Sequence, residues 1–171
     1  LLDGHDHREA VIEADGETLR AWFRPEESRA AEIALETASD AWTLLSERIG
    51  PCPFDEIDLV EVPMQHAAGV EFSGLILVSA EYAKNPDATF FDIIVSHEMA
   101  HQWFYAGVGN DAIEAPWLDE APATYMSYVF LDALRSSSAA TATLAQWSRA
   151  YERARDETPY VSIASPLYAF P

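Results

Sequence analysis

The stretch His97-Glu98-Met99-Ala100-His101 has the pattern H-E-x-x-H and lies in a run of apolar residues at helical spacing. This run predicts a helix from Phe90 to about Ala106, before the turn that begins at Gly107. On a helix with 3.6 residues per turn, the two histidines project from one face. Both imidazoles can therefore reach one metal ion, while the glutamate between them points aside and can hold a water molecule.

A third metal ligand is expected at Glu120, in the first turn of a helix predicted from Trp117 to Arg135. A tight return through the glycine turn lays this helix beside the first. Catalytic zinc takes three protein ligands and keeps a fourth position open, and two histidines with one glutamate are an established set. We therefore expect one Zn²⁺ on His97, His101 and Glu120. For the pentapeptide alone, the alternative is two structural histidines that fall at this spacing by chance.

The residues from Ile93 to Tyr125 resemble the signature of the aminopeptidase N family of gluzincin zinc metallopeptidases. In that family, H-E-x-x-H is followed by eighteen residues and then Glu, and here His101 and Glu120 also have eighteen residues between them. Further matches are Gln102-Trp103-Phe104, Trp117-Leu118-Asp119-Glu120, Ala123 and Tyr125. Ala121 replaces the usual glycine, and the proline after it is tolerated in a first helical turn.

This resemblance implies the roles of the site residues. Glu98 is the expected catalytic residue, which takes the proton of the attacking water and passes it to the leaving amine. The stretch Gly69-Val70-Glu71-Phe72 is similar to the Gly-x-Met-Glu-Asn element of the family. There the backbone pairs with an extended peptide and the glutamate binds the free α-ammonium group. We expect the same of Gly69, Val70 and Glu71, with a peptide that has a free N-terminus as the substrate.

Two further residues have open roles. Asp119 is expected either to cap the second helix, which we favour, or to accept a hydrogen bond from a ligand histidine. The family also uses a tyrosine that donates to the oxyanion. Tyr168 is the candidate in this chain, but its surroundings do not match the Tyr-x-Lys-Gly element of the family. We therefore expect the tyrosine to lie beyond Pro171 and the chain alone to hydrolyse slowly.

The order of elements predicts the α+β class, because strands come first and helices later without regular alternation. The expected elements are a hairpin of residues 11–14 and 18–23 turning at Asp15-Gly16, a helix over 26–49, strands over 57–62 and 70–79, and helices over 90–106, 117–135 and 141–155. A break is expected at Ser136-Ser137-Ser138.

We interpret residues 1–171 as a single catalytic-domain fragment. Its expected parts are a sheet part over 8–80 with the hairpin and long helix, a helical zinc-binding part over 87–155 and an irregular tail over 156–171. The resemblance implies a thermolysin-like domain with a small mixed sheet. Since the sequence starts at Leu1 without a methionine, we expect flanking N- and C-terminal domains of the same protein outside it.

The composition of the chain restricts the classes of partner that it can bind. The 171 residues carry a formal net charge of -19, which disfavours nucleic-acid binding. No apolar stretch reaches the ~18 residues of a membrane helix. The single Cys52 cannot form an internal disulfide and is expected to be a small buried residue. His5, His7 and His66 lack partners at ligand spacing and are expected at the surface. Compartment, oligomeric state and side-chain preference are not indicated.

Three other interpretations stay open at this point. A thermolysin-like endopeptidase would use the same ligands and base, and Glu71 is the residue that separates the two. A non-catalytic scaffold with this fold is the second alternative, although such proteins typically lose ligands or the base. Hydrolysis of an epoxide or another non-peptide substrate is the third.

Overall fold

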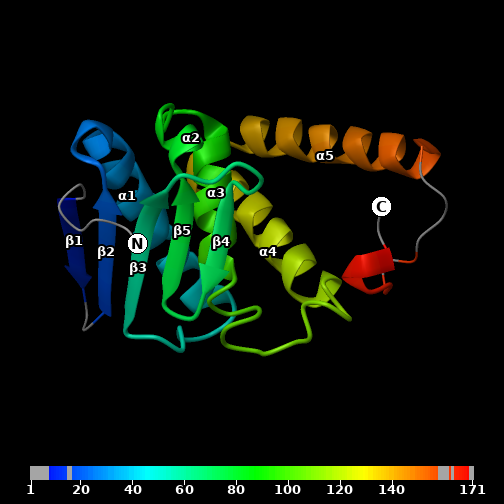
Figure 1. Ribbon diagram of the computed structural model, residues 1–171, viewed down its shortest axis with the longest axis horizontal. Coiled ribbons are helices and arrows are strands. Elements are labelled where there is room, and N and C mark those ends of the chain that lie inside the picture. The colour runs from blue at the N-terminus through cyan, green and yellow to red at the C-terminus, as the bar shows by residue number, and fades with distance from the viewer. Residues whose placement is uncertain (1–7, 15–16, 158–161, 163, 170–171) are drawn as a thin grey trace.

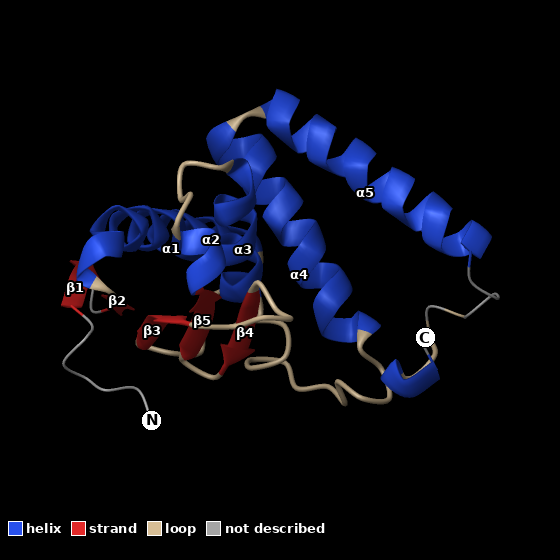
Figure 2. Cartoon of the chain, turned by 45° about the horizontal axis from the view of Figure 1, so that its top comes forward, coloured by secondary structure: helices blue, strands red, loops and turns tan. Residues whose placement is uncertain are grey.

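A mixed sheet of five strands forms the first half of the protein, and helices cover one of its faces (Figures 1 and 2). The computed structural model describes residues 8–14, 17–157, 162 and 164–169. In their order across the sheet, the strands are β1 (Arg8–Ala14), β2 (Glu17–Phe23), β3 (Glu56–Val62), β5 (Leu75–Ser79) and β4 (Gly69–Phe72). The outer pairs β1–β2 and β4–β5 are antiparallel, and β2–β3 and β3–β5 are parallel. Strand β4 therefore forms one edge of the sheet.

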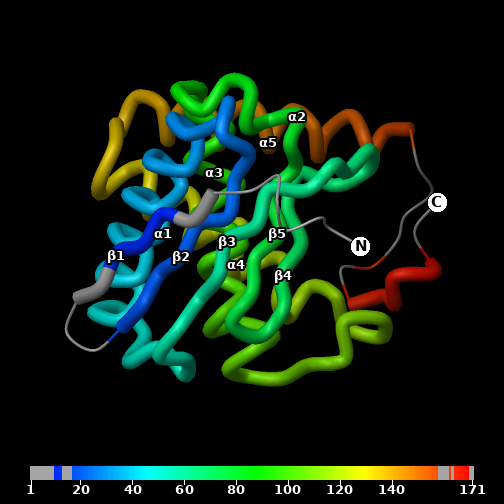
Figure 3. The backbone as a smooth tube through the Cα atoms, turned by 60° about the vertical axis from the view of Figure 1, so that its left-hand side comes forward, coloured from blue at the N-terminus to red at the C-terminus, as the bar shows by residue number. Residues whose placement is uncertain are grey.

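Helices connect and follow the strands. They are the short η1 (Pro25–Glu27), α1 (Ser28–Arg48), α2 (Ala80–Ala83), α3 (Thr89–Ala100), α4 (Trp117–Phe130), the π-helical turn η2 (Leu131–Arg135), α5 (Ser137–Glu157) and the short η3 (Leu167–Ala169). Helix α1 links the parallel strands β2 and β3 and packs against β2 and α3. The backbone trace in Figure 3 shows β3, β5 and β4 side by side in front of α3 and α4.

The core lies between the sheet and the helices. In β2 and β3 alternate residues are buried, among them Phe23, Ile57 and Leu59, because successive side chains of a strand point to opposite faces. Ala34 and Ala38 of α1 are fully buried. Small side chains at these positions let the helix lie close to its neighbours.

Arg135 of η2 contacts three helices. Its guanidinium lies 2.8 Å from Asp40 of α1 and 3.3 Å from Asp92 of α3, and it donates to Thr37 of α1. The same group stacks 4.6 Å from the centre of the Phe130 ring at the end of α4. Ion pairs of this kind fix relative orientation more than they add stability. The cluster therefore holds α1, α3 and α4 in one arrangement.

The predicted α+β class and the mixed sheet followed by helices are confirmed. The hairpin, the long helix and the strand over 57–62 form close to their predicted positions, and the turn at Asp15-Gly16 lies outside the described residues. Among the described residues, no helix combines the length and the apolar character needed to cross a membrane.

Four expectations about local structure are wrong. The strand expected over 70–79 is two strands, β4 and β5, because the chain reverses at Ser73-Gly74, where Gly74 has a φ of 71°. Helix α3 ends at Ala100 and not near Ala106, since the next residues form tight turns. The serine break is limited to Ser136, which is extended. Cys52 is half-buried, and burial raises the pKa of its thiol to about 11.

Candidate metal centre

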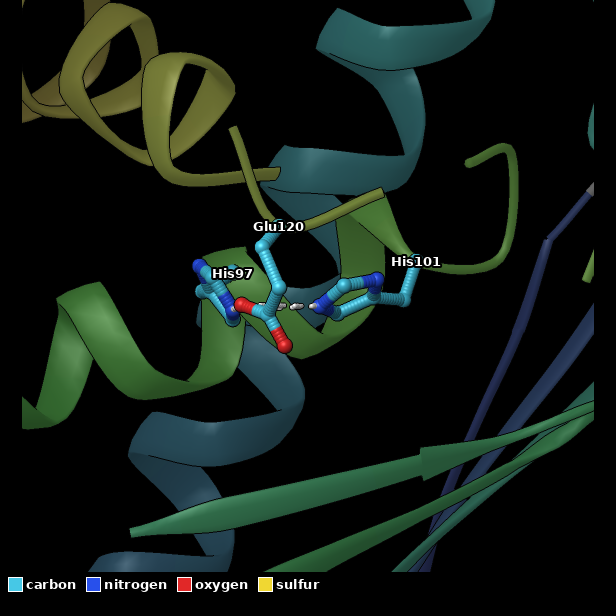
Figure 4. A group of neighbouring side chains, drawn as sticks. All are labelled: His97, His101 and Glu120. Carbon is cyan, nitrogen blue, oxygen red and sulfur yellow. Dashed lines mark hydrogen bonds and ion pairs between the residues drawn. The ribbon is translucent and has the colours of Figure 1, made fainter. Parts of the chain in front are cut away.

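The side chains of His97, His101 and Glu120 converge on one point between α3 and the first turn of α4 (Figure 4). The Nε2 atoms of the two histidines are 3.1 Å apart. The Oε2 atom of Glu120 lies 3.3 Å from Nε2 of His97 and 4.0 Å from Nε2 of His101. The i, i+4 spacing in the sequence produces the histidine pair, and the contact between α3 and α4 brings the carboxylate to it.

This triangle has the size of a zinc coordination shell. Zinc bonds of about 2.0–2.1 Å at tetrahedral angles place ligand atoms about 3.3 Å from one another. The three observed separations of 3.1, 3.3 and 4.0 Å bracket that value. The residues present thus fit a zinc ion in both donor chemistry and spacing.

The ring of His101 is oriented by the backbone. Its Nδ1 lies 3.3 Å from the carbonyl oxygen of Phe104, which can only accept a hydrogen bond. Nδ1 therefore carries the proton, and Nε2 presents a lone pair toward His97. Burial, followed by the neighbouring His97, lowers the pKa of His101 and favours the neutral ring that binds metals. The two Nε2 atoms, 3.1 Å apart, are close enough for one metal ion to bind both.

The negative charge on Glu120 also favours the binding of a metal cation. Its carboxylate is exposed, and its pKa is lowered, chiefly by a hydrogen bond with His97. It is therefore ionised at neutral pH and offers a charged oxygen to a cation beside two neutral rings.

Glu98 is buried beside this triangle, with only 5% of its surface exposed. Its Oε2 has no hydrogen-bond partner among the described residues. Burial, and then the charges of Glu71 and Glu120, raise its pKa to about 9. A buried, unpartnered carboxyl is costly unless something at the site binds it. Glu98 therefore has the environment of a proton-transfer group.

A close approach at Gly69 makes room for the Glu98 side chain. A Cβ atom at this glycine would lie 2.3 Å from Oε1 and 2.5 Å from Cδ of Glu98, closer than real Cβ contacts. Strand β4 can thus pass directly over the carboxyl group of Glu98 only because residue 69 has no side chain.

A cleft of about 360 Å³ is lined by His97, Glu98 and Glu120. The Glu71 carboxylate reaches it from β4 and lies within 4.8 Å of donor atoms of Glu98 and His101. Sequence analysis missed the apolar side chains along its wall, Phe90, Ile93 and Trp147. Only their position in the fold reveals them, because apolar residues on helices carry no signal of a binding site. A larger apolar groove of about 620 Å³ between α4 and α5 contains Glu120 but none of the other candidate ligands, so the smaller cleft is the candidate site.

Tight turns after α3 bring α4 back to the histidines. Tyr105 has a φ of 92°, the only positive φ at a residue other than glycine among the described residues. Its N–H donates to the carbonyl of Val108, and Trp103 donates through its indole N–H to Gly50. These contacts fix the segment between the two ligand-bearing helices, although a positive φ at a tyrosine is unfavourable.

Asp119 is not the cap that the sequence favours, and Tyr168 lies away from the candidate site. Helix α4 is preceded by Pro116 at the N-cap position, so Asp119 is not the cap. Asp119 is buried, accepts from the backbone N–H of Glu120, and its charge acts to raise the pKa of His101. The Tyr168 hydroxyl lies 3.4 Å from the carboxylate of Glu114 and does not line the cleft. His66 is exposed, and His5 and His7 lie outside the described residues.

A mixed sheet backed by a helix with two histidines, with a glutamate from the next helix beside them, is consistent with the catalytic domain of an α+β peptidase. Comparison with known proteins gives the family. The Peptidase family M1 domain matches residues 33–164, so this chain belongs to peptidase family M1. The predicted relationship to aminopeptidase N is thereby confirmed.

Curated relatives are aminopeptidases. Aminopeptidase M1-A of Oryza sativa subsp. japonica is 28% identical over 135 residues, which are 74% of this chain and 15% of the relative. Aminopeptidase 2 of Candida albicans is 28% identical over 124 residues, 68% of this chain and 13% of its own length. Human aminopeptidase RNPEPL1 is 30% identical over 112 residues, 64% of this chain and 15% of the relative. The chain thus spans about 15% of the length of such relatives.

Proposed function

We propose that this chain is the catalytic part of a zinc-dependent aminopeptidase, which removes residues from the free amino terminus of peptides. The triangle of His97, His101 and Glu120, sized for zinc, carries the proposal. Membership of peptidase family M1 and the names of the relatives support it. Residues 8–80 would supply the sheet and residues 87–155 the metal-binding helices.

Zinc held by these three residues would supply a Lewis acid and would lower the pKa of a bound water toward neutrality. Glu98 would accept the proton of the attacking water at its unpartnered Oε2. The carboxyl group holds this proton and then gives it to the leaving amine. Gly69 keeps this carboxyl group in place, since its missing side chain leaves the space that Glu98 fills.

The edge strand β4 binds the substrate in this proposal. An extended peptide can add to an open sheet edge through backbone hydrogen bonds, and Gly69 and Val70 lie on that edge. Glu71 lies beside Glu98, where two carboxylates together favour a cationic group. The α-ammonium group of a peptide is such a cation. Glu71 would therefore set the position of the amino terminus relative to the scissile bond.

The test of amino-terminal specificity compares leucine anilide with its N-acetylated form. We expect cleavage of the free amine only, and Glu71→Ala should lower its kcat/KM by about 10- to 100-fold, the value of a charge-assisted hydrogen bond. Glu36→Ala, an exposed change on α1, is the matched control and should have no effect. Equal cleavage of both substrates by the unmodified protein would favour an endopeptidase.

Substituting Gly69 should damage catalysis more than folding. In Gly69→Ala the new methyl group displaces the Glu98 side chain, and a shift of about 1 Å at a catalytic group can cost about a hundredfold in rate. Zinc content should stay unchanged, because the three ligands lie elsewhere. The control is Gly109→Ala, whose added Cβ meets nothing within 4 Å. Equal rates for the two variants would show that the close approach at Gly69 is irrelevant to the reaction.

Zinc binding should release a proton from Glu98. Near neutral pH this carboxyl is protonated, since its pKa is about 9, and a cation beside it favours the ionised form. Calorimetric titration in buffers of different ionisation enthalpy should show about one more proton released than in Glu98→Gln. His101 adds none, because its lowered pKa already leaves it neutral. An identical proton count in the two proteins would contradict this assignment.

The raised pKa of Glu98 also affects the stability of the zinc-free protein. A carboxyl whose folded-state pKa is raised stabilises the fold fully below its unfolded pKa, and this contribution is lost as pH rises through about 9. The free energy of unfolding of the zinc-free protein should therefore decrease as the pH rises toward about 9. In Glu98→Gln it should decrease less.

A further inference from the structure

Gln102 ties the zinc-site helix to the substrate-binding edge of the sheet. Its side chain is completely buried just after α3. The Oε1 atom accepts from the N–H of Gly74 at 2.9 Å, and Nε2 donates to the carbonyl of Phe72 at 3.2 Å. A longer contact of 3.5 Å runs from Nε2 to the carbonyl of Glu98 within α3. One amide thus bonds the backbone on both sides of Ser73, in the turn between β4 and β5.

That turn needs support from outside. Gly74 has a φ of 71°, whereas Ser73 has no positive φ, which is the pattern of a type II turn. Type II turns splay the two strands of a hairpin, because their twist opposes that of the strands. Strand β4 is also short, Gly69–Phe72, and pairs with β5 alone. The two hydrogen bonds of the Gln102 amide therefore hold β4 in place, which the turn after β4 does not do by itself.

The two ends of β4 meet α3 in different ways. At one end Gly69 lies over the Glu98 carboxyl group, and at the other Gln102 bonds to Phe72 and Gly74. Glu71 lies between these two attachments. Its distance from Glu98 and from the metal ligands therefore depends on both, and loss of either lets the strand shift along or away from the helix.

We infer that Gln102 is a positioning residue for amino-terminal recognition: it fixes β4 over α3 so that Glu71 meets the ammonium group of a substrate bound at the metal. It does not touch the substrate. The inference rests on the proposed function, since it presumes that Glu71 binds a free amine. Gln102, the residue directly after H-E-x-x-H, thus has a role that the metal chemistry itself does not require.

The test measures binding by two metal-directed probes to the zinc-loaded protein. Leucine hydroxamate carries the amine, and the hydroxamate of isocaproic acid is the same molecule without it. Gln102→Met keeps the length of the side chain and removes both hydrogen bonds. We expect leucine hydroxamate to bind about tenfold more weakly or worse, while the amine-free probe is unaffected. Hydrogen exchange of the Gly74 amide should become faster in the same variant.

The controls separate positioning from general loosening. Gln146→Met makes the same chemical change on the exposed face of α5 and should alter neither affinity. If Gln102→Met does not fold, Gln102→Glu replaces it, because ionised glutamate keeps the acceptor for Gly74 and loses the donor to Phe72. Equal weakening of both probes, or of neither, overturns the inference. If the unmodified protein binds both probes alike, the aminopeptidase proposal fails first, and the role of Gln102 falls with it.

Discussion

Glu98→Gln is expected to reduce peptide hydrolysis by about a thousandfold or more while zinc stays bound, because proton transfer by a positioned side chain contributes about 10²- to 10⁴-fold. Glutamine has the same shape and fits beside Gly69, but its amide cannot accept the proton of the water. The loss should appear in kcat. Steady-state kinetics with an aminoacyl anilide, alongside metal analysis of the same sample, measures both quantities.

The matched control is a second buried glutamate. Glu61 of β3 is 1% exposed, is paired with Arg24 and does not line the cleft. Glu61→Gln should lower the midpoint of thermal unfolding, because it weakens a buried ion pair, and should leave kcat near that of the unmodified protein. If Glu98→Gln retained the parent kcat, another group would have to move the proton, and the role proposed for Glu98 would be wrong.

Glu120→Ala should abolish stoichiometric zinc after dialysis. Changing only the partners of metal ligands typically lowers affinity about 10- to 100-fold, so removal of a ligand should cost at least about a hundredfold. The two histidines remain 3.1 Å apart but lose the charged oxygen that completes the set. Competition with a chelating dye gives the affinity, and elemental analysis gives the stoichiometry.

Glu152→Ala, an exposed change on α5, controls for the loss of one negative charge from an acidic protein. It should bind zinc like the parent. Unchanged zinc affinity in Glu120→Ala would remove this residue from the ligand set. A parent protein without stoichiometric zinc would instead favour a non-catalytic scaffold with the fold of the family.

The parts of the site that sequence predicted well depend on local geometry. His97 and His101 share a face because they are four residues apart on a helix, and any helix imposes that relation. The spacing to Glu120 became informative through its resemblance to a known family. By contrast, the reversal at Ser73-Gly74 is hidden in the sequence by the apolar residues on both sides of it, although a serine-glycine pair is a recognised turn signal.

Long-range contacts cannot be predicted from the sequence patterns, for a physical reason. Gln102 bonds to residues about 30 positions earlier, and Arg135 reaches Asp40 across 95 positions. Nothing in composition or periodicity reports which polar side chains meet once the chain is folded. The contact of Gly69 with Glu98 is equally invisible, since it depends on how closely an edge strand approaches a helix. These contacts are the ones that set distances in the cleft.

The candidate site residues come from β4, from α3 with the turn after it, and from the start of α4, all between residues 69 and 120. Gln102 and Phe72, which bond within this cluster, are 30 positions apart. The pairing of β2 with β3 joins Thr18 to Glu56, with the whole of α1 between them. Because the entropy lost on closing a loop grows with its length, the site region costs somewhat less entropy to close than this strand pair.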